Sequence, residues 1–193
     1  MKTKKELIHQ IIELELEMFL TVPTQEKSSC QYYPDSFRLH RRAQFNGWSE
    51  ATLESYLNDL KRAKDEGINL MTVKYARMDK PSFTERSNPL IQKIVSMQYQ
   101  WQQEMIEKYP NLMAGARPIS RTEDTGGNTS FETYLRGELE TYSDHTLSLL
   151  YKDMTDKQEK GINMSEEVYT YLAKELGYGS VEEADRAQKR GLS

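Results

Sequence analysis

Three polar residues interrupt otherwise apolar helix faces, and they are the first candidates for chemistry in this chain. Arg41 and Gln44 fall on the aromatic face of one predicted helix, and Glu138 falls on the apolar face of another. A charge within a buried stripe is costly unless it is paired. Two interpretations stay open. In the first, the three residues line a polar pocket, with Glu138 as general acid/base or cation ligand and Arg41 as anion clamp. In the second, Arg41 and Glu138 form a buried structural ion pair, or the face is less buried than its apolar residues suggest.

A second group of candidates lies in a long segment without helical periodicity, residues 110–129. Arg117 and Arg121 precede an acidic pair, Glu123 and Asp124. Two arginines can grip an anion through paired N–H donors. Long loops within a compact domain are often functional. The alternative is that these charges form salt bridges with one another, and the sequence does not decide between the two.

Three further residues carry weaker hypotheses. Arg136 matches Arg42 in an internal repeat, so each arginine could bind a loop carbonyl or helix end in its own half, or a ligand. Tyr134 would assist Glu138 if that glutamate were catalytic. The single cysteine, Cys30, would be a nucleophile only with a base such as His40 nearby, and no spacing requires this.

The elements that must position these residues come from an internal repeat. Residues 36–71 align without a gap against residues 130–165, and the offset of 94 gives ten identities. These identities include Ser49/Ser143, Asp59/Asp153, Gly67/Gly161 and Asn69/Asn163. A weaker echo precedes them, between the segments that begin at Leu7 and Leu90. The repeat predicts one pseudo-two-fold domain over residues 1–193, with repeats at about 3–80 and 86–178.

Helical periodicity and capping residues predict an all-α fold of about eight to nine helices. We expect helices over about 3–20, 36–47, 50–66, 70–78, 89–109, 131–142, 144–160, 164–176 and 180–190. The last has no counterpart in the first repeat. Ser49, Ser143 and Asn88 are predicted N-caps. Gly67 and Gly161 are predicted to end their helices in the left-handed conformation.

Composition excludes several classes of protein. The chain is 37% apolar and 29% charged, as in ordinary globular domains, and its net charge of −4 disfavours broad nucleic-acid binding. One cysteine cannot form an intramolecular disulfide or a cysteine-based zinc site, and the three histidines lack metalloprotease spacing. We therefore predict no metal site and assign no cofactor. Charges interrupt every apolar run, so we expect no membrane span and a cytoplasmic location.

Several segments resemble a bacterial family known only as a domain of unknown function. These are QFNGWS, LESYLNDLKRAKDEGINL and, most specifically, TSFETYLRGELETYS at residues 129–143. The resemblance runs from about Glu6 to Gly179 and includes Cys30 and Tyr109-Pro110. A turn at residues 116–118 has alanine where the family pattern has glycine. The resemblance implies no established activity or cofactor. Some similar sequences are attached to a nucleotidyltransferase-like domain.

Three functional hypotheses follow. The first is a helical binding or interaction protein that holds a small anionic ligand or a protein partner in a polar pocket at the repeat junction, using Arg41, Gln44, Arg117, Arg121, Arg136 and Glu138. The second is an enzyme in which Glu138 is the acid/base and arginines stabilise an anion. The third, which rests on the resemblance, is a helical partner of a separate nucleotidyltransferase. The sequence does not indicate an oligomeric state.

Overall fold

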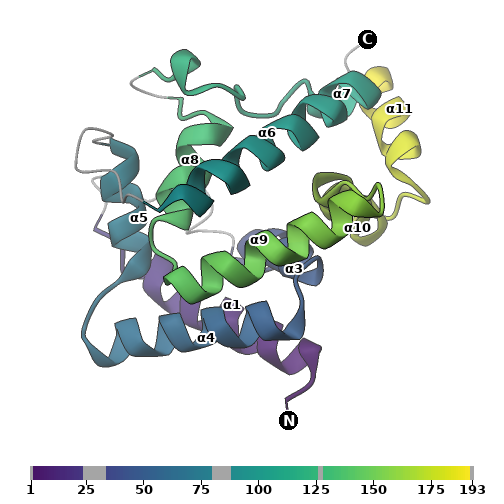
Figure 1. Cartoon of the computed structure of the whole chain (residues 1–193). Helices are drawn as coiled ribbons and strands as arrows, with labels where there is room; N and C mark the ends of the chain where they lie inside the picture. Colours follow the sequence, from purple (N-terminus) through teal and green to yellow (C-terminus); the bar gives the residue numbers. More distant parts are fainter. Residues whose placement is uncertain (1, 24–33, 80–87, 126–127, 192–193) are drawn as a thin grey trace.

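The computed structural model describes residues 2–23, 34–79, 88–125 and 128–191 of the 193-residue chain (Figure 1). In these ranges the regular structure is helical, apart from an isolated bridge between Thr125 and Asn128. The helices are α1 (Lys4–Leu20), α3 (Pro34–Asn46), α4 (Glu50–Asp65), α5 (Leu70–Asp79), α6 (Pro89–Lys108), α7 (Pro110–Met113), the 3-10 turn η1 (Arg121–Glu123), α8 (Phe131–Leu139), α9 (Asp144–Glu159), α10 (Met164–Glu175) and α11 (Val181–Gly191). The predicted all-α, single-domain fold is confirmed.

Capping residues begin and end these helices as their chemistry predicts. The side chains of Ser49 and Ser143 accept hydrogen bonds from the third backbone N–H of α4 and α9. Asn88 caps α6, where proline occupies the first position. Gly67 and Gly161 follow α4 and α9 with φ of 70° and 67°, a conformation that favours glycine.

Two boundary predictions were wrong. Helix α3 begins at Pro34, before the expected start at about residue 36, because proline fits the first turn of a helix without cost. The segment 110–129, expected to be a loop, contains α7 and η1. A helix of four residues is too short to show periodicity, which is the signal on which the sequence prediction depends.

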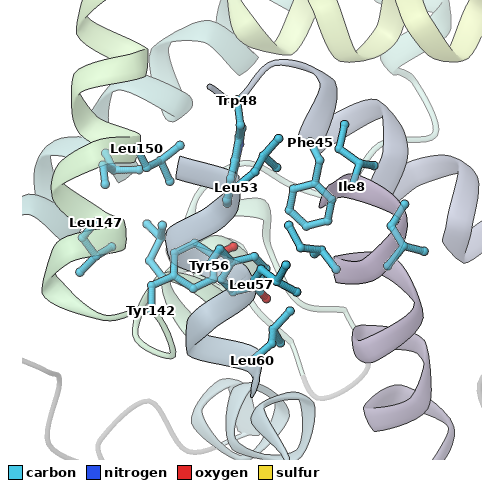
Figure 2. Close-up of a cluster of buried hydrophobic side chains, with 14 of the residues drawn as sticks. Ile8, Phe45, Trp48, Leu53, Tyr56, Leu57, Leu60, Tyr142, Leu147 and Leu150 are labelled. Atoms are coloured by element: carbon cyan, nitrogen blue, oxygen red, sulfur yellow. The ribbon is translucent and has the colours of Figure 1, made fainter. Parts of the chain in front are cut away.

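The core is centred on aromatic rings from α3, from α4 and from the turns that follow α3 and α8 (Figure 2). Trp48 packs edge-on against Phe45, Tyr56 and Tyr142, with ring centroids 5.0, 5.8 and 5.9 Å away. The rings of Tyr56 and Tyr142 are 4.6 Å apart. All four side chains are buried, so large aromatic surfaces hold α3 and α4 against the segment after α8.

The helices form two groups that meet through the helix pairs α4–α9, α3–α10 and α5–α8. Helices α3, α4 and α5 pack on α1, whereas α8, α9 and α10 pack on α6. Helices α7 and α11 pack on each other at the far end of α6 (Figure 1). Within the described ranges, none of the helices combines the length and apolar character needed to cross a membrane.

Candidate functional site

Arg41 and Glu138 meet inside the protein, as their positions on the two helix faces suggested. Arg41 Nη1 donates to Glu138 Oε1 at 3.0 Å. The exposed fractions of the two residues are 6% and 3%. Gln44 joins them, because its Nε2 donates to Glu138 Oε1 at 3.2 Å and its Oε1 accepts from Arg41 Nη1 at 2.7 Å. The three predicted residues therefore form one contact group.

Two charged residues that sequence reasoning did not select complete this group. Glu15 of α1 is wholly buried, and both of its carboxylate oxygens accept from Arg41, one of them at 2.7 Å from Nε. Lys74 of α5 is 2% exposed, and its Nζ donates to Glu138 Oε2 at 2.7 Å. We call Glu15, Arg41, Lys74 and Glu138, with Gln44, the central charged cluster. Two acidic and two basic side chains balance one another there.

Two buried tyrosines close the cluster on the side of the aromatic core. Tyr142 OH donates to Glu138 Oε1 at 2.6 Å, and Tyr56 OH donates to Glu15 Oε1 at 2.7 Å. Figure 2 shows these two rings side by side. A buried hydroxyl needs a partner, and a carboxylate makes the stronger kind of hydrogen bond. The tyrosines thus join the apolar core to the charges.

The cluster shifts the acidity of its members in opposite directions. Burial alone would raise the pKa of Glu138, but the charges of Arg41 and Lys74 and hydrogen bonds from Lys74 and Tyr142 hold it well below its ordinary value. Burial alone would lower the pKa of Lys74 and of Arg41, yet the nearby carboxylates raise both. Glu138 therefore stays ionised and the two basic groups stay protonated at neutral pH.

The tyrosines of the cluster resist ionisation. Burial, followed by the charge of Glu138, raises the pKa of Tyr142 well above its ordinary value. Burial and the charge of Glu15 do the same to Tyr56. Outside the cluster, Tyr75 follows Lys74 on α5, and burial and the neighbouring Tyr134 raise its pKa to about 12. At neutral pH the hydroxyls of Tyr142 and Tyr56 are therefore hydrogen-bond donors and not bases.

A line of contacts leads from the cluster to the surface. Lys74 Nζ lies over the ring of Tyr134, 3.7 Å from its centroid. Arg117 Cζ lies over the same ring at 5.1 Å. Cation–π contacts of this kind are worth about 0.5–2 kcal/mol. Arg117 is exposed and Tyr134 is half-buried, so the path from Glu138 through Lys74 and Tyr134 ends in solvent.

The segment that carries Arg117 is folded onto the start of α8. The guanidinium of Arg117 donates to the carbonyl of Thr129 at 3.0 Å. Asp124 accepts from the backbone N–H of Ser130 at 2.6 Å and also from the hydroxyl of Thr133. The backbone N–H of Arg121 donates to Glu132 at 3.0 Å. The bond to Thr129 holds Arg117 in place, and Asp124 contacts Ser130, the N-cap of α8, and Thr133 in its first turn.

The structure does not gather all the predicted arginines in one place. Arg136 points from α8 toward α6, where its Nη2 donates to Gln92 at 2.6 Å. Its buried Nε has no hydrogen-bond partner. Arg121 is exposed on η1. Cys30 lies outside the described residues. Among the described residues, no group of three or more His, Cys, Asp or Glu is placed to hold a metal ion.

A surface hollow of about 460 Å³ lies elsewhere, near the C-terminal end of the chain. It is lined by residues of α7, α10 and α11 and by the turn after α7, namely Asn111, Leu112, Ala114, Gly115, Ala116, Tyr169 and Gln188. None of these residues belongs to α8 or to the central charged cluster. This hollow therefore does not coincide with the predicted site.

One of the missed residues left a signal in the sequence. Glu15 lies three and four residues after Ile12 and Ile11, which places it on the apolar stripe of α1. A carboxylate at such a position indicates a buried partner, as it did for Glu138. Lys74 left no comparable signal, because α5 is short and its burial comes from contact with α8.

Comparison with known proteins places the chain in a family. A family model described as "Protein of unknown function (DUF4125)" matches residues 5–186. No match was found among curated proteins or solved structures. The family match spans nearly all of the chain and confirms the resemblance noted in its sequence. This chain therefore belongs to the DUF4125 family of proteins of unknown function.

Proposed function

We propose that this protein is a non-catalytic, helical binding protein that holds a small anionic ligand at the edge formed by Arg117 and Tyr134. The observation that supports it best is the line of contacts that joins this edge to the central charged cluster. The exposed end of the line is a guanidinium, and its buried end is a balanced set of charges. A rigid base of this kind keeps the binding groups in position before the ligand arrives.

The chemistry of Arg117 favours an anion. A guanidinium has five N–H donors in a planar fork, which matches carboxylate and phosphate oxygens. One hydrogen bond to Thr129 and the ring of Tyr134 orient it. Arg121 lies four residues away on the same folded segment and is also exposed. The charge of Arg121 helps to lower the pKa of Asp124, and Arg136 is directed toward α6, so the proposal rests on Arg117.

The burial of Glu138 argues against the alternative that this residue is a general acid/base. Oε1 accepts from Arg41, Gln44 and Tyr142, and Oε2 accepts from Lys74. A general base must lie within hydrogen-bond reach of the proton that it takes, and it needs a pKa near the working pH. Glu138 is 3% exposed and its pKa is depressed. Tyr134, at the surface, binds through its ring.

Two other hypotheses stay predictions. A partnership with a nucleotidyltransferase rests on the sequence resemblance, and a cytoplasmic location rests on composition. The Arg117–Tyr134 edge could receive an acidic group of a partner protein as well as a small molecule, since both present the same oxygens to the guanidinium.

A thermal-shift titration tests the proposal. Phosphate, pyrophosphate and succinate are added separately at constant ionic strength, because a ligand that binds only the folded state raises the melting temperature. We expect at least one of them to raise it, and R117A to abolish the increase. R42A is the matched control, because Arg42 is exposed on α3. An increase that persists in R117A, or no increase with any of the three anions, contradicts the proposal.

A further inference from the structure

Two aspartates at equivalent positions of the repeat make equivalent contacts across the molecule. Asp59 and Asp153 are 94 positions apart and lie in α4 and α9. Each carboxylate accepts two hydrogen bonds from the other half, one from the backbone N–H of the capping serine and one from the hydroxyl of the next threonine. Asp59 accepts from Ser143 N–H at 2.9 Å and from the Thr146 hydroxyl at 2.7 Å. Asp153 accepts from Ser49 N–H at 2.8 Å and from the Thr52 hydroxyl at 2.6 Å. The exchange is reciprocal.

Two asparagines at equivalent positions of the repeat also make equivalent contacts, in this case within each half. Asn69 Nδ2 donates to the carbonyl of Met18 at 2.8 Å, and Asn163 Nδ2 donates to the carbonyl of Trp101 at 3.1 Å. Each asparagine also caps the helix that follows it. Met18 and Trp101 are 83 positions apart, which is the offset between the segments that begin at Leu7 and Leu90. Helices α1 and α6 therefore hold equivalent places.

The order of helix contacts follows the same rule. Helices α3, α4 and α5 contact α1, and their counterparts α8, α9 and α10 contact α6. Between the halves, α4 contacts α9, α5 contacts α8, and α10 contacts α3 (Figure 1). The last pair is the α5–α8 contact with the two halves interchanged. Each half thus packs its fourth helix on the second helix of the other.

The line of symmetry can be located from residues that touch their own counterparts. Gln44 contacts Glu138, and Trp48 contacts Tyr142 with ring centroids 5.9 Å apart. Both pairs have the offset of 94. Only residues beside a two-fold axis can contact their own equivalents. The axis therefore passes between α3 and α8, beside the central charged cluster.

We infer that the surface that each half presents to the other is fitted to a second copy of the same half. The chain is therefore the covalently joined form of an isologous dimer in which the two halves exchange their fourth helices. The reciprocal aspartates close this surface on both sides of the axis. The charged cluster is the asymmetric part. Arg41, Lys74 and Glu138 stand where the other half has Leu135, Val168 and Gln44, so only one of the two equivalent sets of positions carries charges.

Backbone amide exchange in the intact chain, followed by NMR, tests this inference. The N–H of Ser143 donates to Asp59, and the N–H of Ser49 donates to Asp153. In D59A we expect exchange at Ser143 to accelerate about tenfold or more, as loss of a hydrogen bond to a charged group allows. Exchange at Ser49 should change by less than about threefold, the error of additivity between separate sites. D153A should produce the opposite pattern.

The control is D65A, since Asp65 is exposed at the end of α4. It should leave both serine amides unchanged. D59N and D153N serve if an alanine variant does not fold, because the amide retains one acceptor oxygen and should give the same pattern at smaller amplitude. The inference is overturned if D59A accelerates exchange at Ser49 as much as at Ser143, or if only one of the two aspartates acts across the halves.

Discussion

Gln44 and Glu138, which the sequence alignment at an offset of 94 pairs with each other, are in contact, with Gln44 Nε2 3.2 Å from Glu138 Oε1. An amide beside a carboxylate supplies a donor where two carboxylates would repel. Arg41 Nη1 lies 2.7 Å from Gln44 Oε1 and 3.0 Å from Glu138 Oε1, which closes a triangle of hydrogen bonds. A single carboxylate at this pair of positions is balanced, whereas two carboxylates would need a second cation.

Removal of the charge of Glu138 should be strongly destabilising. In E138Q, Arg41 keeps Glu15 as a partner but Lys74 is left buried without a carboxylate. Breaking one side of a buried ion network costs about 3–5 kcal/mol, and we expect a loss of unfolding free energy in this range by urea denaturation. E54Q, at an exposed position of α4, should change it by less than about 0.5 kcal/mol. Equal effects of E138Q and E54Q would show that the cluster contributes nothing.

Exchanging the glutamine and the glutamate between positions 44 and 138 should restore part of the lost unfolding free energy. The double variant Q44E/E138Q returns a carboxylate to the reach of Arg41 Nη1, which lies 2.7 Å from the present amide oxygen. Lys74 still lacks its partner, so recovery is incomplete. We expect the double variant to be more stable than E138Q by about 1 kcal/mol, a typical coupling between contacting residues. Q44E alone should be less stable than wild type, because it brings two carboxylates together.

The decrease of the unfolding free energy at acidic pH should depend on Glu138. Its pKa in the folded state lies below the ordinary value of 4.5, so its contribution to stability is fully present above that pH. The contribution is lost as the pH falls from about 4.5 toward the folded pKa. In E138Q the unfolding free energy should fall less steeply below pH 4.5 than in wild type. Parallel curves for the two proteins would contradict the assignment of the shift to this residue.

The decrease of the unfolding free energy at alkaline pH should depend on the buried tyrosines. Burial raises the folded-state pKa of Tyr142 above its ordinary value of 10.0. A group with a raised pKa contributes stability that is fully present below the unfolded value and is lost as the pH rises through the folded one. Y142F should therefore flatten the loss of stability above about pH 10. Y178F is the control, because Tyr178 lies far from the cluster in sequence and is not fully buried.

Much of this fold follows from local chemistry, which explains why its helices could be predicted. Ser49, Ser143 and Asn88 begin helices through bonds to amides three or fewer residues away, so the signal lies within a few positions. The contact between Arg41 and Glu138 could also be anticipated, since both interrupt apolar stripes. The partners Lys74 and Tyr56 could not, because their burial depends on how α5 and α4 pack against distant helices. The bonds that join Arg117 and Asp124 to the start of α8 were also missed, because they connect residues that show no periodicity in the sequence.

Gly137 should be needed for the close approach of α5 to α8. A Cβ added there would lie 3.0 Å from Met78 Cγ and 3.2 Å from the carbonyl oxygen of Lys74. The first contact is with a flexible side chain, but the second is with backbone that also positions Lys74. G137A should therefore lower the unfolding free energy by about 1–3 kcal/mol despite the higher helix propensity of alanine. G115A is the matched control, because a Cβ at Gly115 would meet nothing within 4 Å.

Gly67 and Gly161 should respond alike to substitution, since they end equivalent helices with φ of 70° and 67°. A Cβ added at either position has nothing within 4 Å, so the cost comes from backbone strain alone. A left-handed residue other than glycine costs about 1–2 kcal/mol, and we expect G67A and G161A to lose this amount to within about 0.5 kcal/mol of each other. G67N and G161N should lose less, because asparagine tolerates the left-handed region. A loss at only one of the two glycines would contradict the assignment of the cost to the left-handed conformation that both adopt.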